Sequence, residues 1–164
     1  MLEVLALWPG SRACAVVMAA VLLALDFAWL LAPVFAQPAP EFEIVSVVTR
    51  SEDGTVKSTF HRGEFVFVEV KIRRKDGYYY YYYAEQSFLV LVSARMGSPP
   101  VQYGIGGFRG SLGQGEEITA APGFQIPSYA PTGTMTIKVM VWTNWAAYGG
   151  YPVATPVTVT ITVV

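Results

Sequence analysis

The stretch that most constrains the fold of this chain is residues 134–145, TMTIKVMVWTNW. In an extended conformation its side chains divide between two faces, one carrying Met135, Ile137, Val139 and Val141 and the other carrying Thr134, Thr136, Lys138, Met140 and Trp142. This period of two is typical of a β-strand that packs one face against a core. A glycine-rich loop and a second alternating run, residues 155–164, follow. We therefore expect an all-β fold built around a central strand and its hairpin partner.

Further runs have the composition of strands and are separated by turn signals at roughly ten-residue spacing: residues 42–49, 66–73, 88–92, 101–105, 108–112 and 116–120. The run 88–92 is apolar on both faces, which indicates a strand inside a sheet that is covered on both sides. Glycines punctuate 101–105 and 108–112, which favours two short pieces at a sheet edge. We expect an antiparallel, immunoglobulin-like β-sandwich of seven to nine strands, with a barrel as the alternative.

The N-terminus has the pattern of a secretory signal peptide or a membrane anchor. Residues 13–36 are almost wholly apolar, with Arg12 before them and only Asp26 within them. The run ends in Pro33-Val-Phe-Ala36, whose small residues fit cleavage after Ala36. We predict a secretory signal peptide or, because the run is long enough to span a bilayer, a retained membrane helix. The predicted organisation is residues 1–36 as signal peptide or membrane-anchor helix, 37–40 as a Pro-rich spacer and 41–164 as the sandwich.

Charge and cysteine content argue against several classes of function. A net charge of −1, with 14% charged residues, gives no electrostatic footprint for nucleic acid, so no nucleic-acid partner is expected. Cys14 is the only cysteine and precedes Ala36, so we expect neither a disulfide nor a thiol nucleophile after cleavage. Membrane contact is expected only through residues 13–36, if that segment is not cleaved.

The residues that could support catalysis are few and scattered. His61 is the only histidine, and no Gly-x-Ser-x-Gly motif accompanies it, so neither a zinc site nor a Ser-His-Asp triad is predicted. Glu116 and Glu117 are adjacent, and neighbours on a strand point to opposite faces, so they cannot act together on one bond. We therefore expect that the protein is not an enzyme, and a secreted hydrolase is the least favoured class.

Two motifs resemble ligand-binding loops only in part. Glu52 and Asp53 occupy a predicted turn, but two carboxylates fall short of a calcium-loop motif. The segment Tyr103-Gly-Ile-Gly106-Gly107 is glycine-rich, but no helix follows it to bind a phosphate group. Bulges or a bend at a sheet edge explain these glycines better. No cofactor and no metal ion are therefore expected.

Aromatic residues are the most informative candidates for a binding site. Six consecutive tyrosines follow the predicted strand 66–73, and a second aromatic group lies in the loop of residues 144–152. Each group could cap the core or form a binding face, since tyrosine and tryptophan combine large contact area with a polar tip. In an immunoglobulin-like sandwich these two loops lie at the same end. The predicted aromatic patch is Tyr78, Tyr79, Tyr80, Tyr81, Tyr82, Tyr83, Trp145, Tyr148 and Tyr151.

Short motifs containing proline and glycine precede two of the alternating strands. Phe124-Gln-Ile-Pro127 and Ala130-Pro-Thr-Gly133 come before the strand that ends in Val141-Trp-Thr143, and Phe60-x-x-Gly63 precedes the earlier one. This arrangement resembles prokaryotic, archaeal-type extracellular immunoglobulin-like domains. The resemblance covers about residues 41–164. It implies a structural, adhesive or assembly role at the cell surface and carries no catalytic residue across.

We therefore expect a secreted or cell-surface domain that acts by contact, through adhesion, self-assembly or ligand binding. Its expected partners are protein, either a second copy or another surface protein, or a surface glycan. The alternative is a type IV pilin-like filament subunit, because archaeal pilins resemble this layout of an apolar helix followed by a β-sandwich. Residues 42–48 follow a flexible spacer, so this strand could pair with the open sheet edge of a neighbouring subunit.

Overall fold

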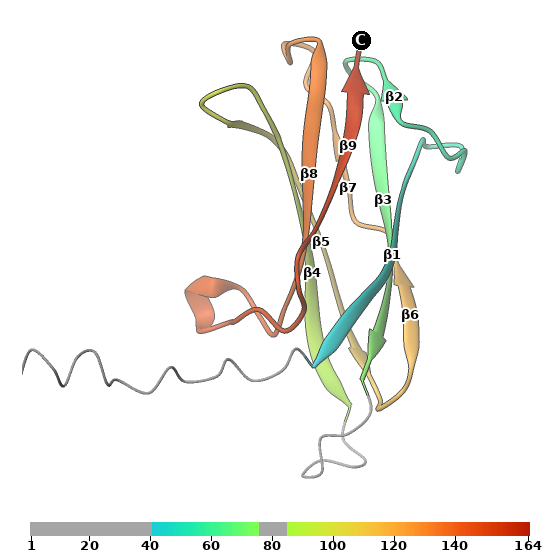
Figure 1. Ribbon diagram of the computed structural model, residues 1–164, viewed down its shortest axis with the longest axis vertical. Helices are drawn as coiled ribbons and strands as arrows, with labels where there is room; N and C mark the ends of the chain where they lie inside the picture. Colours follow the sequence, from blue (N-terminus) through green and yellow to red (C-terminus); the bar gives the residue numbers. More distant parts are fainter. Residues whose placement is uncertain (1–40, 76–84) are drawn as a thin grey trace, which may run out of the picture. The chain divides into compact units, whose positions relative to one another are not determined.

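The computed structural model describes residues 41–75 and 85–164, and the regular secondary structure within them is almost entirely β-strand (Figure 1). The elements, in order, are β1 (Phe42–Arg50), β2 (Thr59–Phe60), β3 (Phe65–Arg74), β4 (Gln86–Met96), β5 (Val101–Leu112), β6 (Glu117–Ala120), β7 (Gly123–Gln125), β8 (Gly133–Trp142), the 3₁₀ helix η1 (Ala146–Tyr148) and β9 (Val157–Val163). The strands form two sheets, one of four strands and one of five. The predicted all-β class is confirmed.

The predicted central strand occupies the middle of the five-stranded sheet, whose order is β2-β9-β8-β4-β5. β8 pairs antiparallel with β9 on one side and with β4 on the other, so the last two strands form the expected hairpin. β4 is an interior strand, as its apolar composition predicts. In the four-stranded sheet β3 pairs with β1 along one edge and with β6 and β7 along the other.

One hydrophobic core joins the inward faces of the two sheets. The alternating residues that the sequence assigns to the inner faces are all fully buried: Val66, Val68, Val70 and Ile72 in β3, and Met135, Ile137, Val139 and Val141 in β8. Removing this apolar area from water is the main term that stabilises the fold. The two sheets therefore pack face to face, as the layers of a β-sandwich do.

β5 and β7 approach each other closely across the layers because β5 lacks side chains at the point of contact. A Cβ atom at Gly106 would lie 2.6 Å from the carbonyl oxygen of Gly123 in β7, closer than packed atoms tolerate. A Cβ atom at Gly104 would overlap the ring of Phe124. The glycines of this segment therefore serve the packing between sheets, and an irregularity of the kind predicted for this segment is present as a shift in register between Ala94 and Arg95 of β4.

The structure corrects the predicted strand boundaries in three places. Residues 101–105 and 108–112 belong to one edge strand, β5. The strand is continuous because its glycines also pair with β4. β2 and β7 span two and three residues, too few to show a period in the sequence. The central strand ends at Trp142 and not at residue 145, because the following loop turns back to pair with the strand end.

Several predictions fall outside the described residues: the apolar N-terminal segment 1–36, the spacer 37–40 and the six tyrosines Tyr78–Tyr83. In the part of the chain that is described, no helix is long and apolar enough to cross a membrane. β1 pairs antiparallel with β3 of its own chain. Exchange of this strand between subunits stays a prediction.

Candidate functional site

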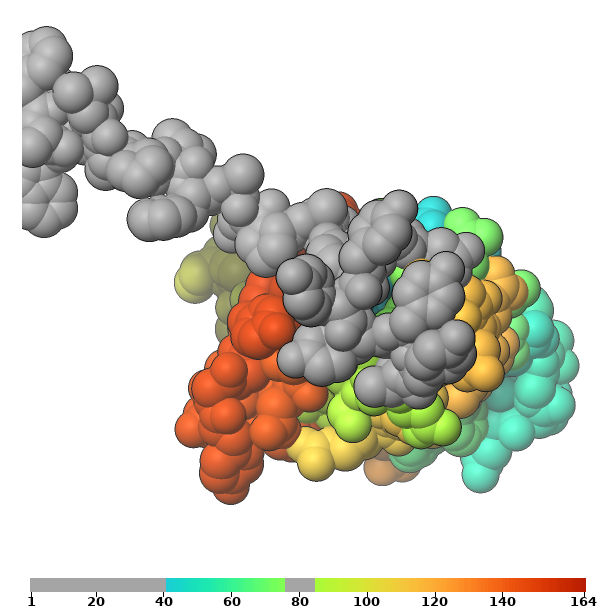
Figure 2. All heavy atoms as spheres, turned by 90° about the horizontal axis from the view of Figure 1, so that it is seen from below, coloured from blue at the N-terminus to red at the C-terminus, as the bar shows by residue number. Residues whose placement is uncertain are grey.

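The segment between β8 and β9, residues 143–156, is called the aromatic loop here because it displays three large rings. The side chains of Trp145, Tyr148 and Tyr151 are 41%, 76% and 56% exposed. The loop, drawn in orange-red with η1, swings away from the strands in Figure 1, and its side chains protrude in the view of Figure 2. Of the nine predicted patch residues, these three are described, and all three are open to contact.

Backbone hydrogen bonds fasten the base of the aromatic loop to the end of β8. The amide of Val153 donates to the carbonyl of Val141 at 2.9 Å, and the amide of Thr143 donates to the carbonyl of Tyr151 at 3.0 Å. These bonds fix the two arms of the loop against each other. A loop held in one conformation loses less entropy on binding than a loose one.

A second set of contacts, around Asn144, holds the part of the loop that contains Trp145 and Gly150. Its side-chain oxygen accepts hydrogen bonds from the guanidinium of Arg109 in β5, at 2.6 Å, and from the amide of Trp145, at 2.9 Å. The amide of Gly150 donates to the carbonyl of Trp145 at 3.0 Å. A Cβ atom at Gly150 would overlap the carbonyl of Asn144, so only glycine fits. The aromatic rings are therefore presented by an ordered scaffold.

The residues that flank the six tyrosines lie at the same end of the domain as the aromatic loop. The amide of Lys75 donates to the carbonyl of Glu41 at 3.0 Å, and the amide of the next residue, Phe42, donates to the carbonyl of Val153 at 2.9 Å. The start of β1 thus joins one flank of the tyrosines to the base of the loop. Tyr78–Tyr83 themselves lie outside the described residues, so their meeting with Trp145 stays a prediction.

Trp145 also borders a shallow hollow of about 360 Å³ on the outer face of the five-stranded sheet. Leu89 of β4, together with Ile105 and Arg109 of β5, lines it. Leu89 lies outside the core cluster and yet is only 3% exposed. The aromatic loop and this sheet face therefore form one continuous surface.

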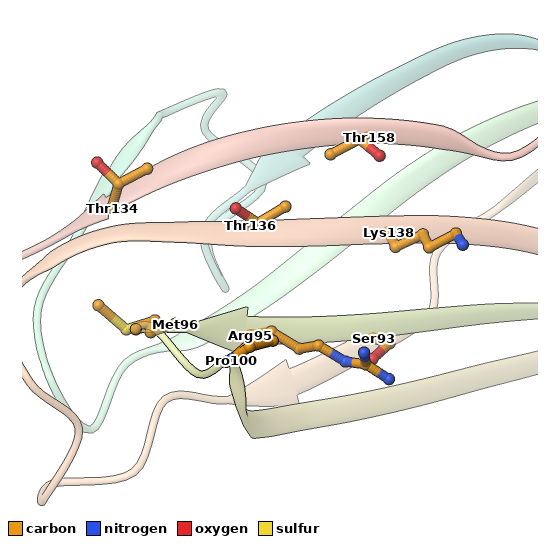
Figure 3. A pocket seen from close by; sticks show the side chains of 9 residues that line it. Ser93, Arg95, Met96, Pro100, Thr134, Thr136, Lys138 and Thr158 are labelled. Carbon is orange, nitrogen blue, oxygen red and sulfur yellow. The ribbon is translucent and has the colours of Figure 1, made fainter.

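Farther along the same sheet face lies a second hollow, of about 400 Å³, which we call the cationic groove (Figure 3). It is lined by Ser93, Arg95, Thr134, Thr136, Lys138 and Thr158, from β4, β8 and β9. The Arg95 side chain extends along β4 toward Ser93, and Lys138 projects from the neighbouring strand. The hydroxyl of Ser93 is buried and has no hydrogen-bond partner among the described residues.

The strands of the five-stranded sheet carry no acidic residue at all, although they include Arg95, Arg109 and Lys138. Within the described ranges, neither Arg95 nor Lys138 forms a salt bridge. Their positive charge is therefore left uncompensated by the protein side chains that the structure describes. A sheet face of this kind attracts anions.

The outer face of the four-stranded sheet has the opposite arrangement. Its cations meet carboxylates on neighbouring strands: Arg50 with Glu69 at 2.7 Å, Lys71 with Glu117 at 2.5 Å and Arg73 with Glu43 at 2.7 Å. Hydrogen bonds from Arg50 hold the pKa of Glu69 below its ordinary value of 4.5, and those from Arg73 do the same for Glu43. The cations of this face are therefore paired with carboxylates of the same sheet.

The remaining residues with potential chemistry do not converge. His61 is exposed and Glu117 is paired with Lys71. The pKa of Asp53 is lowered to about 2, because the hydroxyl of Ser51 and the amide of Thr55 donate hydrogen bonds to its carboxylate. That carboxylate therefore organises its own turn. Among the described residues, no three or more His, Cys, Asp or Glu side chains gather where they could hold a metal ion.

Sequence reasoning identified the aromatic loop but missed the cationic groove. Ser93 and Arg95 lie more than forty residues before Lys138 in the sequence, and only the register of β4 with β8 brings them beside it. The signal that could have been read is the complete lack of Asp and Glu in the runs 86–96 and 133–142, in a chain with twelve acidic residues.

No protein-family model matches this chain, and no curated protein matches it either. The class of this domain is therefore described from its fold and its surface alone. It is an all-β domain of two packed sheets, with an exposed aromatic loop and an uncompensated cationic groove on the outer face of one sheet.

Proposed function

We propose that this chain is an extracellular, immunoglobulin-like β-sandwich domain that acts by contact at the cell surface, in adhesion or self-assembly. The observation that supports this most is the aromatic loop, where Trp145, Tyr148 and Tyr151 stand 41%, 76% and 56% exposed on a hydrogen-bonded scaffold. Leaving rings of this size exposed to water is unfavourable, and burying them at an interface is favourable. Rigid aromatic anchors are the groups that dominate contact energies.

The strand order also supports the immunoglobulin-like comparison. Two sheets, antiparallel except for the parallel pairing of the two-residue β2 with β9, enclose one core, and the long strands β3, β4, β8 and β9 lie where the alternating sequence pattern expects them. A domain of this kind offers loops at its ends and flat sheet faces as contact surfaces. The described residues bring no nucleophile, base and orienting group together, so a contact role accounts for the surface better than catalysis does.

The test replaces Trp145, Tyr148 and Tyr151 together with serine in the full-length chain. We expect the variant to lose co-sedimentation with cell-envelope fragments, or to lose self-association measured by light scattering, while its melting temperature stays unchanged. These rings are exposed, so their loss should leave the core intact. Unchanged binding and unchanged association in this variant would rule the proposal out.

Tyr129 provides the matched control for loss of an exposed ring. It is 79% exposed and lies on the segment before β8, outside the aromatic loop. Tyr129→Ser should bind and associate as the parent chain does. If Tyr129→Ser loses as much as the triple variant, the effect reflects general surface hydrophobicity and not the aromatic loop.

Two proposals for the N-terminal segment remain, secretion with cleavage and a pilin-like retained helix. N-terminal sequencing of the native protein separates them. A first residue of Gln37 means that the apolar segment is removed, and a start near Ala13 means that a helix is kept for polymerisation.

A further inference from the structure

We propose that the cationic groove is a binding site for an acidic polysaccharide, with Arg95 and Lys138 holding a carboxylate of a uronic-acid unit. This site is separate from the aromatic loop and does not depend on the function proposed for that loop. It extends the contact surface of the domain to the flat outer face of the five-stranded sheet.

The strand register places both cations within reach of one anionic group. Ser93 pairs with Lys138, and Arg95 pairs with Thr136. Arg95 and Lys138 are therefore diagonal neighbours across an antiparallel pair, whose Cα atoms lie about 7–8 Å apart in a regular sheet. Two long side chains rooted this close can meet on a single carboxylate.

The positive charge of Arg95 and Lys138 in the groove favours binding of an external anion. Like charges at neighbouring sheet positions repel each other, and no acidic residue on any strand of this sheet relieves the repulsion. A carboxylate between Arg95 and Lys138 would convert this repulsion into two attractive pairs. The planar guanidinium of Arg95 suits a carboxylate in particular, because it can donate two parallel hydrogen bonds.

Hydroxyl groups surround the two cations in a pattern that suits a sugar. Thr134, Thr136 and Thr158 present donors and acceptors along one side of the groove, and the buried hydroxyl of Ser93 has no partner among the described residues. Sugar hydroxyls can pair with such groups in either direction. Pro100, which is exposed, adds an apolar surface to the lining of the groove, against which a ring face can lie.

A polysaccharide fits this place better than an acidic peptide does. The groove lies on the face of the sheet, and β8 pairs with strands on both sides, so its backbone groups are already used in the ladder. An extended peptide would find no backbone partners there, whereas peptides that bind sheets do so at an open edge. Recognition in the groove therefore relies on side chains, which a charged sugar chain satisfies through its carboxylates and hydroxyls.

The test is calorimetric titration of the full-length chain, kept in non-ionic detergent because residues 13–36 are apolar, with polygalacturonate. Methyl-esterified polygalacturonate serves as the neutral polymer of the same backbone, and polyglutamate serves as the acidic peptide. We expect binding to polygalacturonate, none to the ester and weaker binding to polyglutamate. Raising the salt concentration should weaken the binding, since both cations are solvent-accessible.

Substitutions in the groove give the second arm. Lys138→Gln and Arg95→Gln should each lower the affinity for polygalacturonate by about tenfold, the effect of losing one charge-assisted hydrogen bond. Lys71→Gln is the matched control, because Lys71 is also a mid-strand lysine on an outer sheet face but is paired with Glu117. It should bind as the parent chain does, and so should Trp145→Ser, which leaves the groove intact.

Three results would overturn the proposal. Equal losses in Lys138→Gln and Lys71→Gln would mean that only net charge matters. Equal binding of the methyl ester would mean that the carboxylate plays no part, and tighter binding of polyglutamate would assign the groove to an acidic protein segment. If the aromatic-loop variant binds envelope fragments as the parent chain does, the function proposed for that loop fails. The assignment of the cationic groove would still stand, because the two tests change different residues.

Discussion

Both sheets of this domain present lysine and arginine outward from their strands, but the side chains around these cations differ between the two outer faces. On the four-stranded sheet, Arg50 and Lys71 meet Glu69 and Glu117 on adjacent strands. On the five-stranded sheet, the residue paired with Lys138 is Ser93 and the residue paired with Arg95 is Thr136, neither of which carries charge. The same strand geometry thus yields an ion-paired face on one side and an uncompensated one on the other.

The difference shows that the charge of the cross-strand neighbours, directly paired or diagonal, decides what an outward cation does. Lys71 is directly paired with Ser46 and Thr119, but the diagonal Glu117 keeps its charge within the fold, where an exposed pair contributes little to stability. Where neither the paired nor the diagonal neighbours are acidic, as around Lys138, the charge is available to a ligand. Hydroxyls from threonines on β8 and β9 further line the cationic groove, whereas strands β1, β3 and β6 of the other sheet carry the glutamates that pair with its cations.

The largest expected effect separates the inner face of the five-stranded sheet from its outer face. Val139 is fully buried in β8, so Val139→Asp places an unpaired charge in the core and should lower the free energy of unfolding by more than about 3 kcal/mol. Thr160 is exposed on the outer face of β9, so Thr160→Asp should change it by less than about 1 kcal/mol. Urea denaturation measures both. Equal losses would contradict the assignment of the two faces.

A smaller effect is expected at two adjacent glycines of β5 that face opposite sides. Gly106→Ala places a methyl group 2.6 Å from the Gly123 carbonyl oxygen, so it should cost about 1–3 kcal/mol of the free energy of unfolding. Gly107→Ala meets nothing closer than 3.5 Å and should be nearly neutral. Thermal melts of the two variants compare them directly. A neutral Gly106→Ala would show that the layers can separate at this point at little cost.

Charge reversal of one lysine on each outer face tests the comparison itself. Lys138→Glu creates a carboxylate beside Arg95, so it should raise stability by about 0.2–1 kcal/mol. Lys71→Glu sets a carboxylate against Glu117 and should lower stability by a similar amount. Denaturant midpoints of the two variants should therefore move in opposite directions. Shifts of the same sign would mean that the two faces do not differ in the way described.

The smallest expected effect is a difference in acid sensitivity. Because the folded-state pKa of Glu69 is lowered, the contribution of its pair with Arg50 is present above the ordinary value of 4.5 and is lost as the pH falls through the folded-state pKa. Glu69→Gln should therefore lose less stability than the parent chain between neutral pH and pH values below 4.5. Lys138→Gln should show the parent's pH dependence, since it removes no carboxylate pair. Identical pH profiles for the parent chain and Glu69→Gln would contradict the role given to this pair.

The inner faces could be predicted from the sequence because a single physical rule fixes them. Alternation in β3 and β8 assigns Val68 and Val139 to the core without any knowledge of the partner strands. β5 was predicted as two pieces because its glycines weaken the pattern, while the contact with β7 that explains Gly106 comes from the other sheet. Local sequence cannot show such a contact.

The two candidate sites differ in the same respect. The aromatic loop is continuous in sequence, so Trp145 and Tyr148 could be identified as exposed candidates before the fold was known. The cationic groove depends on the register of Ser93 with Lys138, forty-five positions apart, which no local pattern encodes. The predicted meeting of the loop with Tyr78–Tyr83 depends on residues outside those described.

The most direct test of the cationic groove compares two lysines in the unmodified protein. Lys138 and Lys71 both lie on outer sheet faces, where acetylating reagents can reach them, and mass spectrometry measures the extent of acetylation at each. In the presence of polygalacturonate, we expect acetylation of Lys138 to fall while that of Lys71 stays the same, because Lys71 is already paired with Glu117 whereas Lys138 lines the groove. Equal protection of both lysines, or protection of Lys71 alone, would contradict this expectation.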